Sequence, residues 1–593
     1  STREIATDFE DRMDAVGVQL VSTIASNKLN ELRIAYGRRD NPRAPSAVAG
    51  TGPSVTVTGV ANFGGAPTQT EFVEEYWQVI DNYSWFVGRH NLKAGIDVQV
   101  IDDFRRSDVQ ATYIFPTIDA YLAAKSGANR FGYTRFTQAV GDPAVDYSQR
   151  YVSFFVQDDF RITPAFKLLY GVRYDVFQVP DGDPNAPFPA SREFRTDKNN
   201  YAPRVGFAWS LDPESRTVVR GSTGLMYEPP LGMFYQDALQ ENGNPKLLTA
   251  SVTPTQTGAP AFPGALSSLP PGVTPSRSIR TVSPDFDTQY ALLTNLQVER
   301  ALTEDMSLAV GYVNSTGRNL PLLLNSNVIP TGATLPDGRP IYSRTISSAT
   351  RVDSNFDTIN ETRSTGTSQY NALTVSMNRR FQKGFQAQAS YTLAKAEDDG
   401  VIGGRYVIGS TDAAAISDPS DQKRDYSYTS WNTTHTFVAS AVVTPQVSGD
   451  NFGARLANDN QFSVVLQANS GLPFDIRSNR DLNLDGISAD RPNGVERNRG
   501  ELGKVFNADL RYSRFLRFPN ASRVELFFEA KNLFNNASVR SVNSVVTTDT
   551  LGNPVAPIPP RVCSVDDRTS TDCFRVTAGY QQRQMQIGLK YLF

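Results

Sequence analysis

The chain has little of what most enzymes and metal sites are built from, because its 593 residues include two cysteines and two histidines. So few Cys and His residues cannot build the usual zinc or Cys–His catalytic sites more than once. No run of about 18 apolar residues is present, which argues against a transmembrane helix, and no charged-then-apolar start marks a signal peptide. Positive charge is not in excess either, since 58 Lys and Arg face 61 Asp and Glu, and this balance argues against a nucleic-acid partner.

Catalytic motifs are also missing. No Walker-type or GxGxxG loop occurs in the sequence. His90 and His435 have no Cys or second His nearby, so we expect each to be structural rather than a metal ligand. Ser-His-Asp chemistry would need a distant assembly that residue spacing does not reveal. We therefore predict that the chain is not an enzyme.

Aromatic residues, by contrast, are abundant, with 24 Tyr and 34 Phe in a chain that is 39% hydrophobic. Segments such as 166–176 and 584–593 alternate apolar and polar residues with a period of two, which predicts strands with one apolar face. They run for about 10–12 residues, enough to cross a bilayer at a tilt, whereas strands of soluble sandwiches run for about 5–6. Aromatic residues gather at strand ends, as in the girdles of outer-membrane barrels, at Tyr370, Phe381, Phe506, Phe518, Tyr591 and Phe593.

These patterns predict an all-β fold, a transmembrane antiparallel β-barrel, because every backbone group in lipid must be hydrogen-bonded. Short links and long segments alternate along the chain, as periplasmic turns and external loops do. An odd strand count, with the first strand arriving from the loop side, indicates that at least one earlier strand is missing. Seventeen strands are expected, at about 16–25, 29–37, 76–88, 91–101, 150–162, 165–177, 201–211, 216–227, 288–300, 306–318, 370–381, 384–395, 432–444, 460–475, 506–518, 523–535 and 582–593.

Two connections stand out from the rest. Residues 444–460 form a supposed periplasmic link that is longer than is usual for such barrels. The Pro-rich stretch 259–275 is expected to be an irregular loop, either ordered or flexible. On the polar faces of the strands, charged residues are expected to line a hydrated lumen, namely Arg173, Asp175, Asp509, Arg511, Glu525, Glu529 and Lys531.

Several segments resemble TonB-dependent outer-membrane receptors. Residues 151–174, YVSFFVQDDFRITPAFKLLYGVRY, carry the FxQDxF…GxRY pattern of that family, and residues 202–207, APRVGF, resemble its APRxGF motif. Four further segments resemble the Oar-like branch of the family, at residues 370–399, 470–473 (SGLP), 481–492 (DLNLDGISADRP) and 529–535 (EAKNLFN). The resemblance extends over nearly the whole chain.

The resemblance implies a barrel of the roughly 22-stranded type, to which the whole chain, residues 1–593, would contribute about 17 strands. The first strands, the plug domain and the TonB box would lie upstream. It implies a multi-pass protein of the bacterial outer membrane, in contact with lipid and lipopolysaccharide. The barrel would be the conduit of a transporter that the TonB–ExbB–ExbD system energises through the plug. The long external loops favour a large ligand or a surface protein over a bare ion.

Two other interpretations remain open. The barrel could be a surface anchor or adhesion protein with no transport of its own, whose loops bind neighbours or matrix. The absence of a TonB box upstream would favour that alternative. The chain could also be a soluble multi-domain β protein, which would be extracted without detergent.

One external loop has the spacing of a calcium site. Residues 481–486, DLNLDG, place oxygen-bearing side chains at positions 1, 3 and 5 with Gly at 6, as a Ca²⁺ loop does. Pro492 stands where an EF-hand has its bidentate Glu, so Asp490 would have to substitute. The alternative is an Asp/Asn-rich turn in a solvated loop. The candidate Ca²⁺ ligands are therefore Asp481, Asn483, Asp485 and Asp490.

Two smaller features carry expectations of their own. Cys563 and Cys573 share one external loop, and outside the cytoplasm such a pair is expected to form a disulfide. Glu397, Asp398 and Asp399 lie at the outer end of a strand, where a solvated loop rim is favoured over a site for divalent ions or lipopolysaccharide.

The C-terminal alternation resembles the insertion signal that the barrel-assembly machinery reads. That machinery would recognise an exposed edge strand by β-pairing. The same residues can equally be the last barrel strand, and both roles are compatible. The apolar face of this segment consists of Ile587, Leu589, Tyr591 and Phe593.

Overall fold

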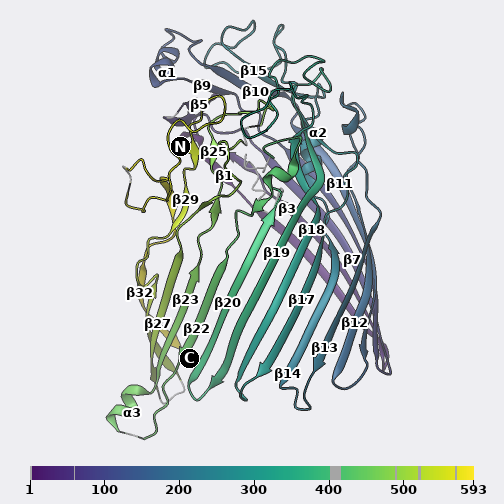
Figure 1. The fold of residues 1–593 in the computed structure, drawn as a ribbon, viewed down its shortest axis with the longest axis vertical. Coiled ribbons are helices and arrows are strands. Elements are labelled where there is room, and N and C mark those ends of the chain that lie inside the picture. Colours follow the sequence, from purple (N-terminus) through teal and green to yellow (C-terminus); the bar gives the residue numbers. More distant parts are fainter. Residues whose placement is uncertain are drawn as a thin grey trace.

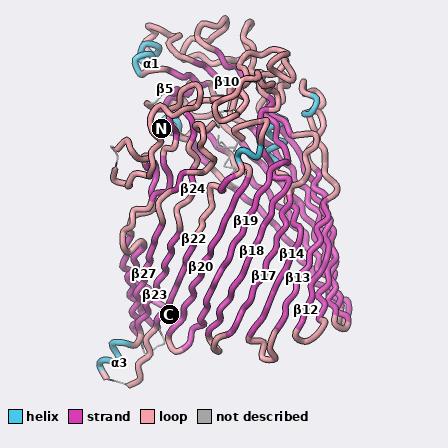
Figure 2. Tube along the Cα trace, viewed as in Figure 1, coloured by secondary structure: helices cyan, strands magenta, loops and turns pink. Residues whose placement is uncertain are grey.

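The computed structural model describes residues 3–58, 60–400, 416–449, 451–487, 490–518, 522–567 and 570–593. Long, tilted strands form the wall of a tall barrel, and most loops gather at its upper end (Figures 1 and 2). The strands pair antiparallel around the wall. The expected all-β antiparallel barrel is confirmed.

The wall is one ladder in which each strand pairs antiparallel with the next. Within the described residues it has seventeen strands, and each overlaps one of the seventeen expected segments. In order they are β2 (Arg12–Ala25), β3 (Lys28–Asp40), β7 (Glu71–Val87), β8 (His90–Arg106), β11 (Ala144–Arg161), β12 (Phe166–Gln178), β13 (Asn200–Ser210), β14 (Thr217–Tyr227), β17 (Tyr290–Ala301), β18 (Met306–Asn325), β19 (Ile359–Gln382), β20 (Phe385–Asp398), β22 (His435–Val443), β23 (Asn460–Asn469), β27 (Val505–Arg517), β28 (Arg523–Lys531) and β32 (Gln584–Leu592).

The first and last strands of this ladder have one neighbour each. Over the part of the chain that the structure describes, β2 is in register with β3 and β32 is in register with β28, and no register joins β2 to β32. Nearly every residue of both strands is exposed, on both faces of the sheet. A strand packed between two neighbours within a wall would be less exposed, so β2 and β32 are sheet edges.

Tight turns join strands at the lower end of the wall. Lys383 and Gly384 connect β19 to β20, and both have positive φ, as a two-residue hairpin turn requires. The connection from β22 to β23 is far longer and carries a short helix, α3 (Phe452–Ala457). Most of the short turn expected at residues 519–522 lies outside the described residues.

Side chains alternate between the two faces of the wall, as strands dictate. The outer face exposes apolar residues over its whole circumference, among them Val18, Trp77, Val156, Leu296 and Leu526. The inner face is polar and cross-linked by ion pairs. Arg173 Nε lies 2.7 Å from Asp175 Oδ1, and Arg511 Nη2 lies 2.8 Å from Glu525 Oε1.

A small five-stranded sheet stands above the barrel wall (Figure 1). Its order is β15 (Leu247–Val252), β10 (Arg135–Gly141), β9 (Thr112–Phe115), β5 (Ser54–Val57) and β6 (Ala61–Gly64), with α1 (Ile118–Lys125) beside it. Tyr113, Phe115 and Phe136 form its core. The Pro-rich stretch 259–275 is irregular but packed, because Phe262 joins this core and the Gly264 carbonyl accepts a 2.7 Å hydrogen bond from the Tyr113 hydroxyl.

Shorter elements brace the remaining loops. Within the described ranges, no helix is both long and apolar enough to cross a membrane. The remaining elements are α2 (Gly232–Gln240), β16 (Ile279–Val282) parallel to β19, β21 (Ser427–Tyr428) beside β20, and the pairs β1 (Thr7–Phe9) with β4 (Arg43–Pro45), β24 (Pro473–Phe474) with β26 (Gly500–Glu501), β25 (Arg477–Ser478) with β30 (Val545–Val546), and β29 (Val539–Val542) with β31 (Val576–Gly579), together with 3-10 turns at Arg3–Ile5, Pro189–Ser191 and Gln422–Asp425.

Candidate functional site

Three arginines tie the external loops together at the upper end of the barrel. They come from the loop between β18 and β19 and from the loop between β23 and β27, and all three are buried. Each is bonded to aspartates from other segments of the chain. We call this set the mouth network: Arg339, Arg491 and Arg497 with Asp337, Asp398, Asp425, Asp475 and Asp490.

Arg339 is the most enclosed member of the mouth network. Its side chain is 2% exposed, and it forms ion pairs with Asp490, whose side chain is 1% exposed, and with Asp337. Its Nη2 also donates a 2.8 Å hydrogen bond to the Arg491 carbonyl oxygen. A buried guanidinium must be satisfied by such partners because its desolvation is costly. The loop after β18 is therefore fixed to the loop after β23.

Arg491 forms a two-pronged contact with Asp475. Its Nε lies 2.7 Å from Asp475 Oδ1 and its Nη2 lies 3.0 Å from Oδ2, while Nη1 binds Asp425. Burial alone would raise the pKa of Asp475, but the guanidinium groups of Arg491 and Arg477 outweigh it and the pKa is lowered. Asp475 is therefore ionised at neutral pH, and the fork geometry holds its loop rigidly.

The acidic cluster at the end of β20 is part of this network, and the expectation of a solvated rim was wrong for two of its members. Asp398 and Asp399 are buried. Asp398 pairs with Arg497, and Asp399 Oδ2 accepts hydrogen bonds from the backbone nitrogen and hydroxyl of Thr367 at 2.7 and 2.6 Å. The long extensions of β19 and β20 past the membrane bring these partners together. Glu397 lies nearer the surface, 2.9 Å from Lys395.

The predicted calcium loop is a tight, buried turn beside Arg339. Asn483 Oδ1 accepts a hydrogen bond from the Asp485 nitrogen at 3.1 Å, and Asp481 Oδ2 accepts one from the Gly486 nitrogen at 3.2 Å. Among the residues that the structure describes, buried Asp481 Oδ1 has no hydrogen-bond partner. Asp490 is engaged differently, because its two carboxylate oxygens bind Arg339 and the Leu482 nitrogen.

Burial dominates the titration of these carboxylates. It raises the pKa of Asp485 well above its usual value, and the negative charges of Asp490 and Asp481 add to the rise. It also raises the pKa of Asp481, and it raises that of Asp490 to about 6 although Arg339 opposes the change. Oxygen ligands with poorly compensated charge are suited to a hard cation such as Ca²⁺. The arrangement is compatible with calcium, and the calcium assignment stays a prediction.

The two cysteines form the expected disulfide, Cys563–Cys573. Both are buried within the loop between β28 and β32. Phe574, next to Cys573, packs edge-on against Phe474 of β24 at a centroid separation of 5.1 Å. The disulfide therefore lies where this loop joins the others. Asp567 lies close to both sulfurs, but disulfide sulfurs offer no thiolate for a metal.

Both histidines have the partners of structural residues. His90 Nδ1 lies 2.6 Å from Asp158 Oδ2, and the ring stacks on Phe160. His435 Nδ1 lies 2.7 Å from the Tyr391 hydroxyl. These contacts join neighbouring strands at the surface of the wall.

The arginines of the mouth network did not emerge from the sequence. Two of them, Arg491 and Arg497, follow the calcium motif closely, in the segment 491–499, RPNGVERNR, and that local excess of arginine after four acidic or amide positions was the available signal. The partners of the three arginines lie as much as 151 residues away. Spacing along the chain does not reveal such pairs.

A family model described as an outer membrane beta barrel domain matches residues 3–509. Among solved structures, the chain is similar to the outer membrane transporter YddB from Escherichia coli, with 12% identity, a TM-score of 0.56, and coverage of 92% of this chain and 61% of that one. It is also similar to the FrpB iron transporter from Neisseria meningitidis, with 13% identity, a TM-score of 0.50, and coverage of 91% and 61%. The copper transporter OprC is similar at 9% identity and a TM-score of 0.50, with coverage of 99% and 66%.

The chain thus spans less than two thirds of the length of these solved structures. No curated protein matches its sequence. At such identities the similarity establishes the fold alone, which is that of an outer-membrane β-barrel.

Proposed function

The chain belongs to the outer membrane beta barrel domain family, and we propose that it is the barrel of a TonB-dependent transporter for a large ligand. Its place is the bacterial outer membrane. In this proposal the lumen is the conduit and the external loops bind the ligand. The observation that carries the proposal is the charged, internally paired inner wall.

The inner wall is suited to a hydrated passage. Arg511 binds Glu525 on the next strand and lies 3.2 Å from Glu529, and Arg173 lies 3.9 Å from Asp97 besides its contact with Asp175. Such pairs in a wet lumen contribute little to stability. They keep the wall polar without leaving a strong field of one sign, so solutes of either charge could pass.

The mouth network supports the ligand-binding part of the proposal. Buried ion pairs hold three loops, those between β18 and β19, β20 and β22, and β23 and β27, in a fixed arrangement. A rigid frame under long loops reduces the entropy lost when those loops close on a ligand. The identity of the cargo remains open in this proposal.

We further propose that additional strands of the same protein pair with the edges of β2 and β32. Unpaired strand edges in lipid would leave backbone groups without hydrogen bonds, each at a cost of several kcal/mol. A plug and a TonB box upstream would then complete the energised transporter. The Oar-like branch belongs to the same proposal.

Cysteine labelling in living cells tests the transport function without knowledge of the cargo. Arg220 of β14 pairs with Glu299 of β17 on the lumen face. Gln297 lies directly opposite Arg220 and two residues from Glu299, so it also faces the lumen, whereas Val298 faces lipid. The described residues contain no free thiol that would compete. We expect Gln297→Cys in the full protein to react with a membrane-impermeant maleimide faster when the inner-membrane proton gradient is intact.

The matched control is Val298→Cys, which should stay unlabelled under both conditions because it lies in lipid. Labelling of Gln297→Cys that does not respond to collapse of the proton gradient would support the surface anchor instead.

A further inference from the structure

The connection between β22 and β23 is an unusual feature of the lower end of the barrel. Residues 444–459, all of which the structure describes except 450, stand in place of a tight turn and carry α3. Figure 1 shows α3 outside the outline of the wall, at the level of the turns. The lower end of the barrel is the periplasmic end, because short turns lie there and long loops lie at the other. The hairpin therefore lies at the periplasmic leaflet.

The hairpin has a defined structure. Asn458 clamps it with two hydrogen bonds to the backbone of Val447, at 2.8 Å through Oδ1 and at 2.9 Å through Nδ2. Asn451 caps the start of α3 by accepting a 2.8 Å hydrogen bond from the Ala454 nitrogen. The side chain of Ala454 faces inward and is buried. The connection is thus a folded unit rather than a slack loop.

The helix is fastened to the outer surface of the wall. Arg514 Nη1 donates hydrogen bonds to the carbonyl oxygens of Leu456 and Asn458, at 2.9 and 2.5 Å. Asn460 Nδ2 donates to the Leu456 carbonyl as well, at 2.7 Å. A cation and an amide at the last carbonyls of a helix are favourable, because those carbonyls have no partner within the helix.

One face of α3 is apolar and exposed. Phe452 is 82% exposed and Leu456 is 61% exposed. Their spacing of four residues places them on one face of α3. Two large apolar side chains so exposed on a six-residue helix are not explained by folding of the hairpin itself.

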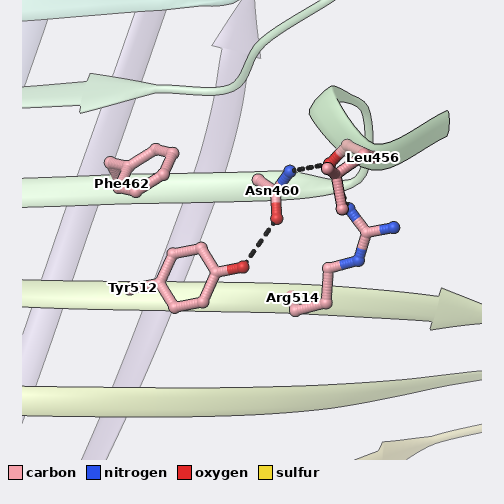
Figure 3. Close-up of a pocket in the computed structure, with 5 residues that line it drawn as sticks. All are labelled: Leu456, Asn460, Phe462, Tyr512 and Arg514. Carbon is pink, nitrogen blue, oxygen red and sulfur yellow. Dashed lines mark hydrogen bonds between the residues drawn. The ribbon is translucent and has the colours of Figure 1, made fainter. Parts of the chain in front are cut away.

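A cavity of about 350 Å³ lies between α3 and the wall, and Figure 3 shows its lining. It is lined by Leu456, Asn460, Phe462, Tyr512 and Arg514. The rings of Phe462 and Tyr512 lie 5.0 Å apart and form its floor, and the Tyr512 hydroxyl donates a 2.8 Å hydrogen bond to Asn460 Oδ1. Among the described residues, this lining holds one positive charge and no carboxylate.

This cavity opens toward the membrane, not toward the lumen. Arg511 points into the lumen, where it binds Glu525 and Glu529, and side chains alternate along β27. Tyr512 and Arg514 are therefore on the face opposite to Arg511, which is the lipid face. Phe462, directly across from Tyr512 on β23, lies on the same face. The apolar face of α3 continues this lipid-facing surface.

We propose that residues 444–459 form a hairpin seated in the periplasmic leaflet of the outer membrane, which binds one phospholipid. Its phosphate lies at Arg514, and an acyl chain lies along Leu456, Phe462 and the ring of Tyr512. Arginine suits a phosphate, and an amphipathic helix in the interface buries its apolar face among acyl chains. The continuity of this face with the lipid-facing wall favours lipid over a protein partner.

Fluorescence quenching tests the position of the helix. Leu456→Cys in the full protein, labelled with an environment-sensitive dye and placed in phosphatidylglycerol and phosphatidylethanolamine vesicles, should be quenched strongly by phospholipid carrying a nitroxide near the headgroup. Val352→Cys, in an exposed loop at the opposite end, is the control and should respond weakly. Equal responses at the two positions would overturn the proposal. So would a Leu456→Cys signal that ignores the lipid quencher but shifts when periplasmic proteins are added.

Native mass spectrometry tests the binding site. The full protein in detergent, titrated with phosphatidylglycerol, should retain one lipid, and Arg514→Gln should weaken that binding about tenfold, because a hydrogen bond to a charged group is lost. Arg523→Gln is the matched control, since Arg523 lies at the same end of the wall but on the lumen face, with Glu525. It should bind lipid like the wild type.

A second variant guards against loss of the α3 attachment in Arg514→Gln. Leu456→Gln keeps every backbone hydrogen bond of the helix end but removes the apolar side chain that α3 contributes to the cavity, and it too should weaken lipid retention. Retention unchanged in both variants would overturn the proposal, as would equal losses in Arg523→Gln. Phosphatidylethanolamine in place of phosphatidylglycerol tells whether the phosphate suffices or a net negative headgroup is required.

Discussion

Arg339 and Asp490 lie 151 residues apart in the chain and form an ion pair that is almost completely buried at the mouth of the barrel. Arg339 belongs to the loop after β18, and Asp490 closes the segment that was predicted to bind calcium. One contact thus couples the frame of the external loops to the candidate metal loop. A change in the charge of Asp490 is expected to reach both.

Loss of Arg339 should loosen the mouth without unfolding the wall. Arg339→Met leaves Asp490 as a buried carboxylate without its cation, which typically costs about 3–5 kcal/mol. We expect hydrogen exchange of the loop after β23 to accelerate strongly while exchange in β17 to β20 stays unchanged. Arg344→Met is the control, because Arg344 is 71% exposed and lies 3.9 Å from Asp481. It should have little effect, and equal effects of the two variants would contradict a role for buried charge.

The mouth should be more stable at mildly acidic pH than at neutral pH in the absence of divalent ions. Burial raises the pKa of Asp490 to about 6, so the folded state holds this proton more tightly than the unfolded chain does. The resulting stability is fully present below pH 3.8 and is lost as the pH rises through about 6, on the order of 2–3 kcal/mol. Hydrogen exchange at pH 5 and 7, corrected for the intrinsic exchange rate, measures it. Asp490→Asn should remove the part of this pH dependence that Asp490 contributes, while Asp481 and Asp485, whose pKa values are also raised, keep a dependence of the same sign.

Calcium should reverse that trend at neutral pH if the predicted site binds it. A cation would neutralise Asp481 and Asp485, whose raised pKa values reflect burial with too little compensating charge. Calcium at ten times its dissociation constant would stabilise the loop by about 1.4 kcal/mol. A chelator should therefore lower the melting temperature of the wild type but not of Asp485→Ala. Asp549→Ala, at an exposed acid in a neighbouring loop, should keep the chelator effect, and a wild type indifferent to chelator would exclude the site.

The membrane wall could be read from the sequence because lipid imposes a local rule. Along β12, Leu168, Tyr170 and Val172 alternate with Lys167 and Arg173, so the pattern marks the strand wherever it occurs. The same rule stops at the membrane surface. The expected strands at 306–318 and 370–381 were therefore too short, since β18 and β19 run on to Asn325 and back to Ile359.

The loops could not be predicted in this way, because their structure depends on distant partners. The small sheet above the barrel is made of short strands whose side chains pack into a shared core. Val55 and Tyr113, for example, come from separate loops and meet in that core. The sequence predicted that Asp398 would be solvent-exposed, because its partner Arg497 lies 99 residues further along the chain. For α3, the only signal in the sequence was the unusual length of the connection between β22 and β23.

Reduction of the disulfide should loosen one loop and leave the others intact. Cys563 and Cys573 are separated by 10 positions, and opening so small a ring costs about 3 kcal/mol in the chain-entropy estimate. We expect trypsin to cut after Arg561 or Arg575 several times faster once the protein is reduced. Cleavage after Arg344, in a loop without a disulfide, is the internal control and should not change. A general increase at both places would show that the whole mouth had opened.

The lipid-facing side of β32 should control insertion into the outer membrane. Leu589 is exposed on that face, beside Ile587 and Tyr591, and a lysine there would have to be buried in lipid at a cost of about 2–4 kcal/mol near the midplane. Leu589→Lys should therefore reduce the amount of protein in the outer-membrane fraction several-fold and leave it in the periplasm for proteases. Lys590→Gln changes the charge one residue further along, on the lumen face, and should insert normally. Equal losses in the two variants would point to the edge pairing of β32 rather than to its apolar face as the feature that the assembly machinery reads, because both substitutions lie on the same edge strand.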